Sequence, residues 1–277
     1  ALRIARLHER LTGLGYTVED LGNVAVDQPE RAATGPSNAR YLQEIAHTCA
    51  RLAEMVELAA DGGKVPVVLG GDHSIGAGTV AGMSRHFAKH GERLGLIWID
   101  AHADMNTPET SPSGNVHGMP LACILGRGPA ELAGLAGRTP MVAPQNVAIV
   151  GLRSVDDLER LNVRGTGVHP FTMRDIDERG MTSVIREAIA AASAGTAGFH
   201  VSYDMDSVDP SEAPGVGTPV PGGLTYREAH LAMELIGDSG RMTSVEVVEV
   251  NPVMDVANKT AVLGVELIMS ALGKRIL

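Results

Sequence analysis

Short apolar runs alternate with segments of helical spacing along most of this chain. The apolar runs are residues 16–21, 65–69, 94–99, 146–151, 166–171, 198–203 and 244–250. The helical patterns are residues 2–11, 38–60, 75–89, 116–125, 182–194, 225–236 and 256–272. Strand followed by helix, repeated, favours parallel pairing of strands with helices on both faces of the sheet. The sequence therefore predicts a three-layer α/β/α fold with a mainly parallel central sheet.

Composition narrows the class of protein. Residues 1–277 are expected to form one domain, because no linker or shift in composition divides them. A net charge of −10 argues against a nucleic-acid partner, which needs a basic surface. Cys49 and Cys123 stand far apart in apolar segments and predict buried thiols in a reducing compartment, the cytoplasm. The charged opening segment and the lack of long apolar runs predict neither signal peptide nor membrane span.

Three side chains able to bind metals alternate directly after the apolar run 94–99. Asp100, His102 and Asp104 occupy every second position there. An extended segment points alternate side chains to one side, so the three groups are expected to converge beyond the strand. Ligands of open parallel sheets bind at this edge, beyond the carboxyl ends of the strands. The triplet therefore predicts one part of a metal site.

Two other apolar runs end in side chains of the same kind. Asp204 and Asp206 follow residues 198–203, and His73 follows residues 65–69. A single aspartate at a strand end is usually a turn former or a helix N-cap. Four carboxylates together without a cation would instead raise one another's pKa. With the triplet, these residues are too many ligands for one ion and predict a centre of two.

The kinds of ligand indicate which metal and which chemistry. Oxygen donors with two imidazoles and no nearby cysteine disfavour structural zinc, and favour Mn²⁺ before Fe²⁺, Co²⁺ or Ni²⁺. Two such ions, about 3.5–4 Å apart, can share a water and lower its pKa towards neutrality. The predicted chemistry is metal-assisted hydrolysis.

Further candidates surround this edge of the sheet. Glu249 ends the run 244–250, whereas Glu246 lies three residues earlier and is expected to face a helix or solvent. The polar loop 106–118 contains His117; a lone histidine at a helix start is more often a structural group, but this loop follows the metal-binding triplet directly. The loop 207–223 is rich in Gly and Pro, as is typical of a pocket wall or a subunit contact.

The motifs resemble those of the ureohydrolase superfamily and, within it, the arginases of the bacterial type. Six segments stand in the order and local spacing of that family: 70–74, 100–106, 113–118, 204–210, 217–219 and 249–252. The Ser-Gly-Asn-x-His-Gly pattern of residues 113–118 is similar to arginases rather than agmatinases. The implied fold is arginase/deacetylase-like.

This resemblance also implies a set of metal ligands. One Mn²⁺ would be held by His73, Asp100, Asp104 and Asp204. The other would be held by Asp100, His102, Asp204 and Asp206. Asp100 and Asp204 would then bridge two Mn²⁺ per subunit.

By the same resemblance, the enzyme would convert L-arginine to L-ornithine and urea, through attack of a metal-activated hydroxide on the guanidinium carbon. The implied catalytic residues are His117, which would relay protons, Glu249, which would pair with the guanidinium, and Asp104. The implied substrate-binding residues are Asn106, Ser113, Asn115, Asp156, Thr218 and Glu249. For Asp156 the alternative is an acid in the first turn of a helix.

Three other functions remain open at this stage. An agmatinase or another guanidino-substrate ureohydrolase would keep every metal ligand and differ in the loop 106–118. A two-metal phosphoesterase is suggested by the Asp-x-His and Gly-Asn-x-His elements, but the chain has no arginine cluster for phosphate. An inactive metal-binding assembly protein would lack a ligand or the proton shuttle.

The resemblance also raises expectations about the ends of the chain and its assembly. Chains of the family usually begin with an apolar strand and a glycine-containing loop. Residues 2–11 read instead as a helix, so we expect the family's first N-terminal strand to be absent from residues 1–277. The family resemblance implies a homotrimer or a homohexamer.

Overall fold

A parallel sheet of six strands forms the middle layer of the computed structural model, which describes residues 1–27, 32–275 and 277. The strands lie in the order β1-β6-β5-β2-β3-β4, and every neighbouring pair is parallel. Their bounds are Val67–Leu69 (β1), Leu94–Ile99 (β2), Val147–Leu152 (β3), His169–Thr172 (β4), Gly198–Asp204 (β5) and Met242–Val248 (β6).

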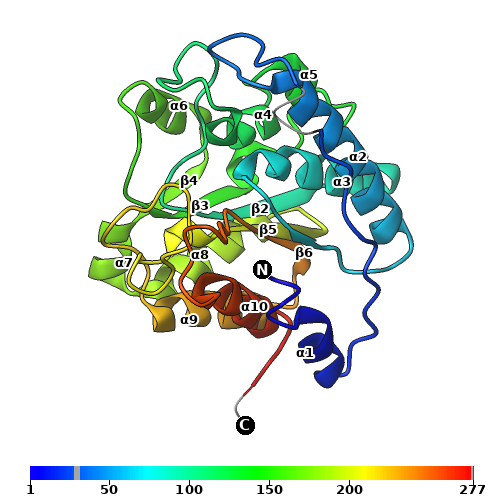
Figure 1. The fold of residues 1–277 in the computed structure, drawn as a ribbon, viewed down its shortest axis with the longest axis vertical. Coiled ribbons are helices and arrows are strands. Elements are labelled where there is room, and N and C mark those ends of the chain that lie inside the picture. The colour runs from blue at the N-terminus through cyan, green and yellow to red at the C-terminus, as the bar shows by residue number, and fades with distance from the viewer. Residues whose placement is uncertain (28–31, 276) are drawn as a thin grey trace.

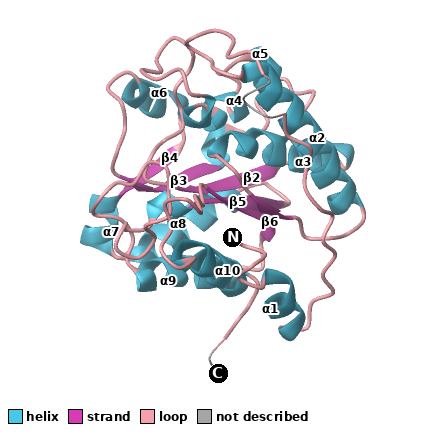
Figure 2. Ribbon diagram, in the orientation of Figure 1, coloured by secondary structure: helices cyan, strands magenta, loops and turns pink. Residues whose placement is uncertain are grey.

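Helices cover both faces of this sheet (Figures 1 and 2). The helices α2 to α6 lie on one face, and α7 to α10 lie on the other. Their bounds are Leu7–Gly13 (α1), Leu42–Asp61 (α2), Gly76–Lys89 (α3), Pro120–Ile124 (α4), Ala130–Ala133 (α5), Glu159–Thr166 (α6), Met173–Arg179 (α7), Met181–Ser193 (α8), Tyr226–Asp238 (α9) and Lys259–Ala271 (α10). The predicted three-layer α/β/α fold is confirmed. Among the described residues, no helix has the length and apolarity needed to cross a bilayer.

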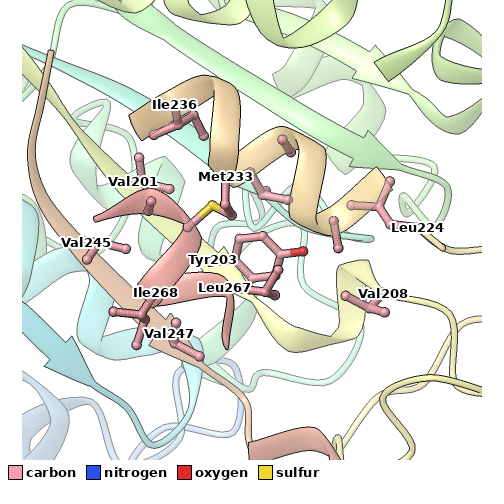
Figure 3. Packing of buried hydrophobic residues seen from close by; sticks show 14 of the residues in the cluster. Val201, Tyr203, Val208, Leu224, Met233, Ile236, Val245, Val247, Leu267 and Ile268 are labelled. Atoms are coloured by element: carbon pink, nitrogen blue, oxygen red, sulfur yellow. The ribbon is translucent and has the colours of Figure 1, made fainter. Parts of the chain in front are cut away.

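Alternate side chains of the central strands pack into different cores. Ile97 and Ile99 of β2 belong to the core under α8, α9 and α10, whereas Leu96 and Trp98 belong to the core under α2 and α3. Figure 3 shows β5 and β6 packed against α9 and α10 around the buried Tyr203. Each fully buried aliphatic or aromatic side chain of this kind contributes about 1.5–3 kcal/mol. Burial on both faces explains why the strands read as continuous apolar runs.

The sequence-based boundaries are wrong at several places. Residues 16–21 form no strand; the Tyr16 hydroxyl instead donates to the backbone oxygen of Leu272 over 2.7 Å, and this segment has no ladder partner among the described residues. The strand predicted at 166–171 begins only at His169, because α6 continues to Thr166. The helix predicted at 116–125 is split into the 3-10 helix Val116–Gly118 and α4, with Pro120 at the start of α4.

Candidate metal centre

The predicted site residues meet at the carboxyl ends of four adjacent strands, β1, β6, β5 and β2. His73 follows β1 and opens the 3-10 helix His73–Ile75. Asp100 follows β2, Asp204 ends β5, and Glu249 follows β6. These residues are far apart in the chain, so the strand order of the sheet is what brings them together.

One imidazole nitrogen faces three carboxylate oxygens. His73 Nδ1 lies 3.1 Å from Asp100 Oδ2 and 3.0 Å from the Oδ2 atoms of Asp104 and Asp204. All four residues are buried. Among the described residues, His73 Nδ1 and Asp104 Oδ2 nevertheless have no hydrogen-bond partner of proper geometry. Buried polar atoms without partners that point at one place suit a bound cation.

A second group of side chains adjoins the first. His102 Nδ1 lies 3.0 Å from Asp206 Oδ2 and 3.5 Å from Asp100 Oδ1. Asp100 therefore presents Oδ2 to His73 and Oδ1 to His102. The sets His73, Asp100, Asp204 and Asp100, His102, Asp206 each have ligand atoms close enough to hold one ion. Two clusters that share Asp100 are consistent with a binuclear metal site.

The electrostatics of this centre also fit divalent cations. Burial, followed by the charge of Asp100, raises the pKa of Asp104 well above its usual range. Burial, together with the charges of Asp206 and Asp100, does the same to the pKa of Asp204. Burial opposes the charged form of His102, but the hydrogen bonds of Asp100 and Asp206 raise its pKa to about 12.

The backbone turns at the ligands instead of continuing as an extended strand. The backbone N–H of His102 donates to Asp100 Oδ1 over 2.7 Å, and that of Asp206 donates to Asp204 Oδ1 over the same distance. Asp104 has a left-handed backbone, with φ of 52°. Such turns are typical of aspartate, and strained backbone of this kind gathers at functional sites. The extended geometry predicted for residues 100–104 is therefore wrong, although the convergence of their side chains is confirmed.

Two residues that the motifs did not indicate support the first group. The Trp98 ring stacks on His73 at 4.0 Å between centroids, and its Nε1–H donates to Asp100 Oδ2 over 3.0 Å. Ser202 Oγ lies 2.7 Å from His73 Nε2. Both residues stand inside apolar runs, where no local pattern distinguishes a supporting side chain from a core one.

Glu249 and Thr218 border the two groups as expected. Glu249 Oε1 accepts the backbone N–H of His73 over 2.7 Å, and burial raises the Glu249 pKa. Thr218 Oγ1 donates to Asp206 Oδ2 over 3.0 Å. The glycine- and proline-rich loop is therefore attached directly to one candidate ligand.

Arg153, which no sequence motif indicated, holds the same loop in place through hydrogen bonds. Its guanidinium donates to the backbone oxygens of Asp206 over 2.6 Å, Ser207 over 3.0 Å and Val220 over 2.8 Å. The residue is half-buried and joins the end of β3 to the loop 207–223. A guanidinium with several donors can hold separate backbone segments in one arrangement.

The predicted substrate-binding residues on the loop 106–118 differ in burial and in their partners, and Asn106 is buried. Asn106 Nδ2 donates to Asp156 Oδ2 over 2.9 Å, so the structure brings these two residues together. Ser113 is exposed, whereas Asn115 and His117 are half-buried. The backbone N–H of Asn115 donates to Ser113 Oγ over 3.1 Å.

Two glutamates lie close to the site: Glu159, which no motif indicated, and Glu246, which was expected to face a helix or solvent. Glu159 accepts the backbone N–H of Met105 over 2.8 Å and that of Asp156 over 3.2 Å, and so joins two loops of the site. Glu246 is fully buried and does not face solvent. A Cβ on Gly76 of α3 would lie 3.0 Å from Glu246 Oε1, so the glutamate faces this helix.

Comparison with known proteins gives one consistent result. The model of the arginase family matches residues 2–273. The arginase of Bacillus caldovelox is 48% identical, over 100% of this chain and 92% of its own length. Its crystal structure has a TM-score of 0.95, with 100% of this chain and 91% of that chain covered. The arginase structure from Bacillus subtilis is also 48% identical over the same shares, with a TM-score of 0.92.

More distant structures share the fold. A hypothetical agmatinase from Burkholderia thailandensis is 24% identical, covers 83% of this chain and 65% of its own, and has a TM-score of 0.65. The match to the family model over residues 2–273 and the 48% identity to the two Bacillus arginases identify the family more closely than the shared fold does. The chain therefore belongs to the arginase family.

Proposed function

We propose that this protein is an arginase that converts L-arginine to L-ornithine and urea with two Mn²⁺ ions. The observation that carries the proposal is Asp100, whose two oxygens face two separate histidine nitrogens. One ion would be held by His73, Asp100, Asp104 and Asp204, and the other by Asp100, His102, Asp204 and Asp206. The oxygen-rich ligand set favours hard cations and the two histidine nitrogens favour a transition metal, a combination that suits Mn²⁺.

Glu249 is the residue proposed to orient the substrate. When bound, the two ions supply a hydroxide near neutral pH. The Glu249 carboxylate, anchored through Oε1 to the backbone of His73, pairs with the substrate guanidinium and directs its carbon towards the centre. A delocalised cation is a poor electrophile, so the reaction depends on this orientation.

His117 is the residue proposed to supply the proton of the leaving group. It lies half-buried in the 3-10 helix Val116–Gly118, which contacts the 3-10 helix His73–Ile75. An imidazole titrates near neutral pH and can donate a proton to the departing amine. As the C–N bond breaks, the leaving nitrogen takes the proton from His117 and departs as the amino group of ornithine, while the carbon keeps the oxygen added to it and, once that oxygen loses its proton to water, becomes urea.

The outer loop is proposed to recognise the α-amino acid end of arginine. Asn106, Ser113 and Asn115 would bind the α-carboxylate, and Asp156 would lie near the α-amino group. The hydrogen bond between Asn106 and Asp156 supports a joint role of their two loops. Since agmatine lacks the carboxylate, this end of the site would separate the two substrates.

Paired assays of urea release test the function. After Mn²⁺ loading, L-arginine and agmatine are supplied separately at matched concentrations, and kcat/KM is measured for each. We expect hydrolysis of arginine, with agmatine strongly disfavoured. Preference for agmatine would indicate a different guanidino hydrolase, and no urea from either substrate would refute the proposal.

Glu249→Gln should reduce kcat/KM for arginine roughly 30- to 150-fold, which corresponds to a loss of about 2–3 kcal/mol of transition-state stabilisation. The glutamine keeps an oxygen for the His73 N–H but loses the charge that pairs with the guanidinium. Metal content should therefore stay near the wild-type value. Steady-state kinetics and metal analysis check this, and loss of Mn²⁺ would show that Glu249 acts on the centre instead.

Gly114→Ala should raise KM for arginine about tenfold without loss of Mn²⁺, an effect near 1.4 kcal/mol. Gly114 has φ of 70°, and a Cβ there would lie 1.9 Å from the backbone oxygen of Ser37. The loop carrying Asn115 must shift to admit the methyl group. Gly137→Ala is a matched control, because Gly137 has φ of 67° and nothing within 4 Å of a Cβ. Equal effects of both variants would contradict a role of loop placement.

The assembly and the compartment are also proposed. Family membership supports a homotrimer or a homohexamer, which light scattering would detect as three or six times the 28.9 kDa of this chain. Cys49 and Cys123 are buried free thiols, and burial raises the pKa of each to about 12. Unreactive thiols of this kind support a cytoplasmic location.

A further inference from the structure

Behind the candidate metal centre lies a row of fully buried polar side chains. His200 and Ser202 of β5 and Ser244 and Glu246 of β6 have no exposed surface. Burying a carboxylate beside an imidazole costs free energy unless the groups have partners, and replacing such pairs by apolar residues is often neutral or stabilising. The proposed reaction uses none of these four residues.

The row is connected to the metal centre through one histidine. His73 Nε2 lies 2.7 Å from Ser202 Oγ, and Ser202 Oγ donates to Glu246 Oε1 over 2.6 Å. At the other end, His200 Nε2 lies 3.4 Å from the same Glu246 oxygen, and His200 Nδ1 lies 2.8 Å from Ser244 Oγ. Glu246 is thus the one acid in the row, two hydrogen bonds from His73.

Space for the Glu246 side chain is provided by a glycine. A Cβ on Gly76, at the start of α3, would come within 2.9 Å of the Trp98 ring and 3.0 Å of Glu246 Oε1. Trp98 itself stacks on His73. The helix, the tryptophan and the glutamate therefore form one packed support for the His73 ring.

The chemistry of these groups gives the hydrogen bonds a direction. Burial would raise the pKa of Glu246, but the imidazole of His200, whose Nε2 lies 3.4 Å from Glu246 Oε1, outweighs burial and lowers that pKa. An ionised carboxylate only accepts hydrogen bonds, so the Ser202 hydroxyl must donate to it. The Ser202 oxygen is then left as an acceptor for His73, and His73 must carry a proton on Nε2. Its Nδ1, which faces the three aspartates, is consequently free to be a metal ligand.

We propose that Glu246 is a positioning residue, which acts through Ser202 to hold His73 in the tautomer whose Nδ1 can bind a metal ion. The inference rests on the proposed metal centre, but not on arginine being the substrate. Outer hydrogen-bond partners of a histidine ligand typically change metal affinity by about 10- to 100-fold. Glu246 would exert such an effect from one residue further away.

Glu246→Gln is the direct test, because glutamine keeps the shape of the Glu246 side chain but no longer fixes the direction in which the Ser202 hydroxyl donates its hydrogen bond. A glutamine amide can donate to Ser202, which can then donate to His73 Nε2 and favour a proton on Nδ1. We expect the affinity for one of two Mn²⁺ ions to fall about 10- to 100-fold, as measured by calorimetric titration and by EPR of the partly loaded protein. The second ion should bind as in the wild type, and saturating Mn²⁺ should restore kcat to within a few fold.

Two further variants separate positioning from a general structural role. Ser244→Ala removes an equally buried hydroxyl at the far end of the row, beyond His200, and should leave both Mn²⁺ affinities unchanged even if it lowers the melting temperature. Ser202→Ala should weaken the same Mn²⁺ ion as Glu246→Gln. Since Glu246 acts through Ser202, the double variant should show no further loss of affinity.

Several results would overturn the inference. These are unchanged affinity for both ions in Glu246→Gln, equal weakening in Ser244→Ala, or additive effects of Ser202→Ala and Glu246→Gln. If Glu246→Gln does not fold, normal Mn²⁺ binding by Ser202→Ala would have the same consequence. A wild-type protein that binds two Mn²⁺ but releases no urea would instead refute the proposed function and leave this inference standing.

Discussion

Asp100→Ala should empty both ion sites and abolish urea release. Asp100 is the residue common to the two candidate groups, with Oδ2 facing His73 and Oδ1 facing His102. An alanine removes a ligand from each ion at once. The loss of metal removes several kcal/mol of catalytic stabilisation, so activity should fall about 10³-fold or more.

Metal analysis and thermal unfolding check this prediction. The wild type should carry two Mn²⁺ per subunit, and each ion should raise its stability by about 2.7 kcal/mol when free Mn²⁺ is 100 times the dissociation constant of that ion. Asp100→Ala should show neither. Asp61→Ala is the control, because Asp61 lies at the exposed end of α2 and, within the part of the chain that the structure describes, its side chain bonds to His86 and Lys89 only. A variant of Asp100 that kept two ions and full activity would refute the whole metal scheme.

His117→Asn should lower kcat by about 10²- to 10⁴-fold while both Mn²⁺ ions remain bound. Asparagine retains polarity and similar size, but it cannot transfer a proton near neutral pH. His117 belongs to neither of the two ligand groups, so the metal content should not change.

The control for this variant is His90→Asn. His90 is an exposed residue that follows α3, and its replacement should leave kcat unchanged. Added imidazole should partly restore turnover in His117→Asn, since a diffusible donor can replace the missing one. If His117→Asn lost its metal, His117 would be a ligand and not a proton donor.

Local patterns in the sequence predicted the framework of the site well. The runs 94–99 and 198–203 became β2 and β5 almost without change, because burial on both faces leaves a continuous apolar signal. The polar residues that end those runs could be placed at one edge of a parallel sheet. The strand predicted at residues 16–21 was wrong, because an apolar segment forms a strand only where a neighbouring strand completes its backbone hydrogen bonds.

Glu246 illustrates the limit of such patterns. Its spacing from Glu249 placed it on another face of β6, but nothing local indicated whether helix or solvent would cover that face. The answer came from Gly76 of α3, which leaves room for the glutamate in the core.

The kinds of ligand and their positions at strand ends follow from neighbouring residues alone, because strand periodicity and turn formation are short-range effects. Which particular atoms pair across the sheet does not follow from neighbouring residues. His73 and Ser202 are 129 residues apart and Ser202 and Glu246 are 44 apart, yet their side chains are in hydrogen-bond contact. Such contacts depend on the order β1-β6-β5-β2, which the packing of the helices on the sheet selects. The motifs and the family resemblance therefore indicated a metal centre that shares Asp100, and the folded sheet places Asp100 between the two candidate ligand groups.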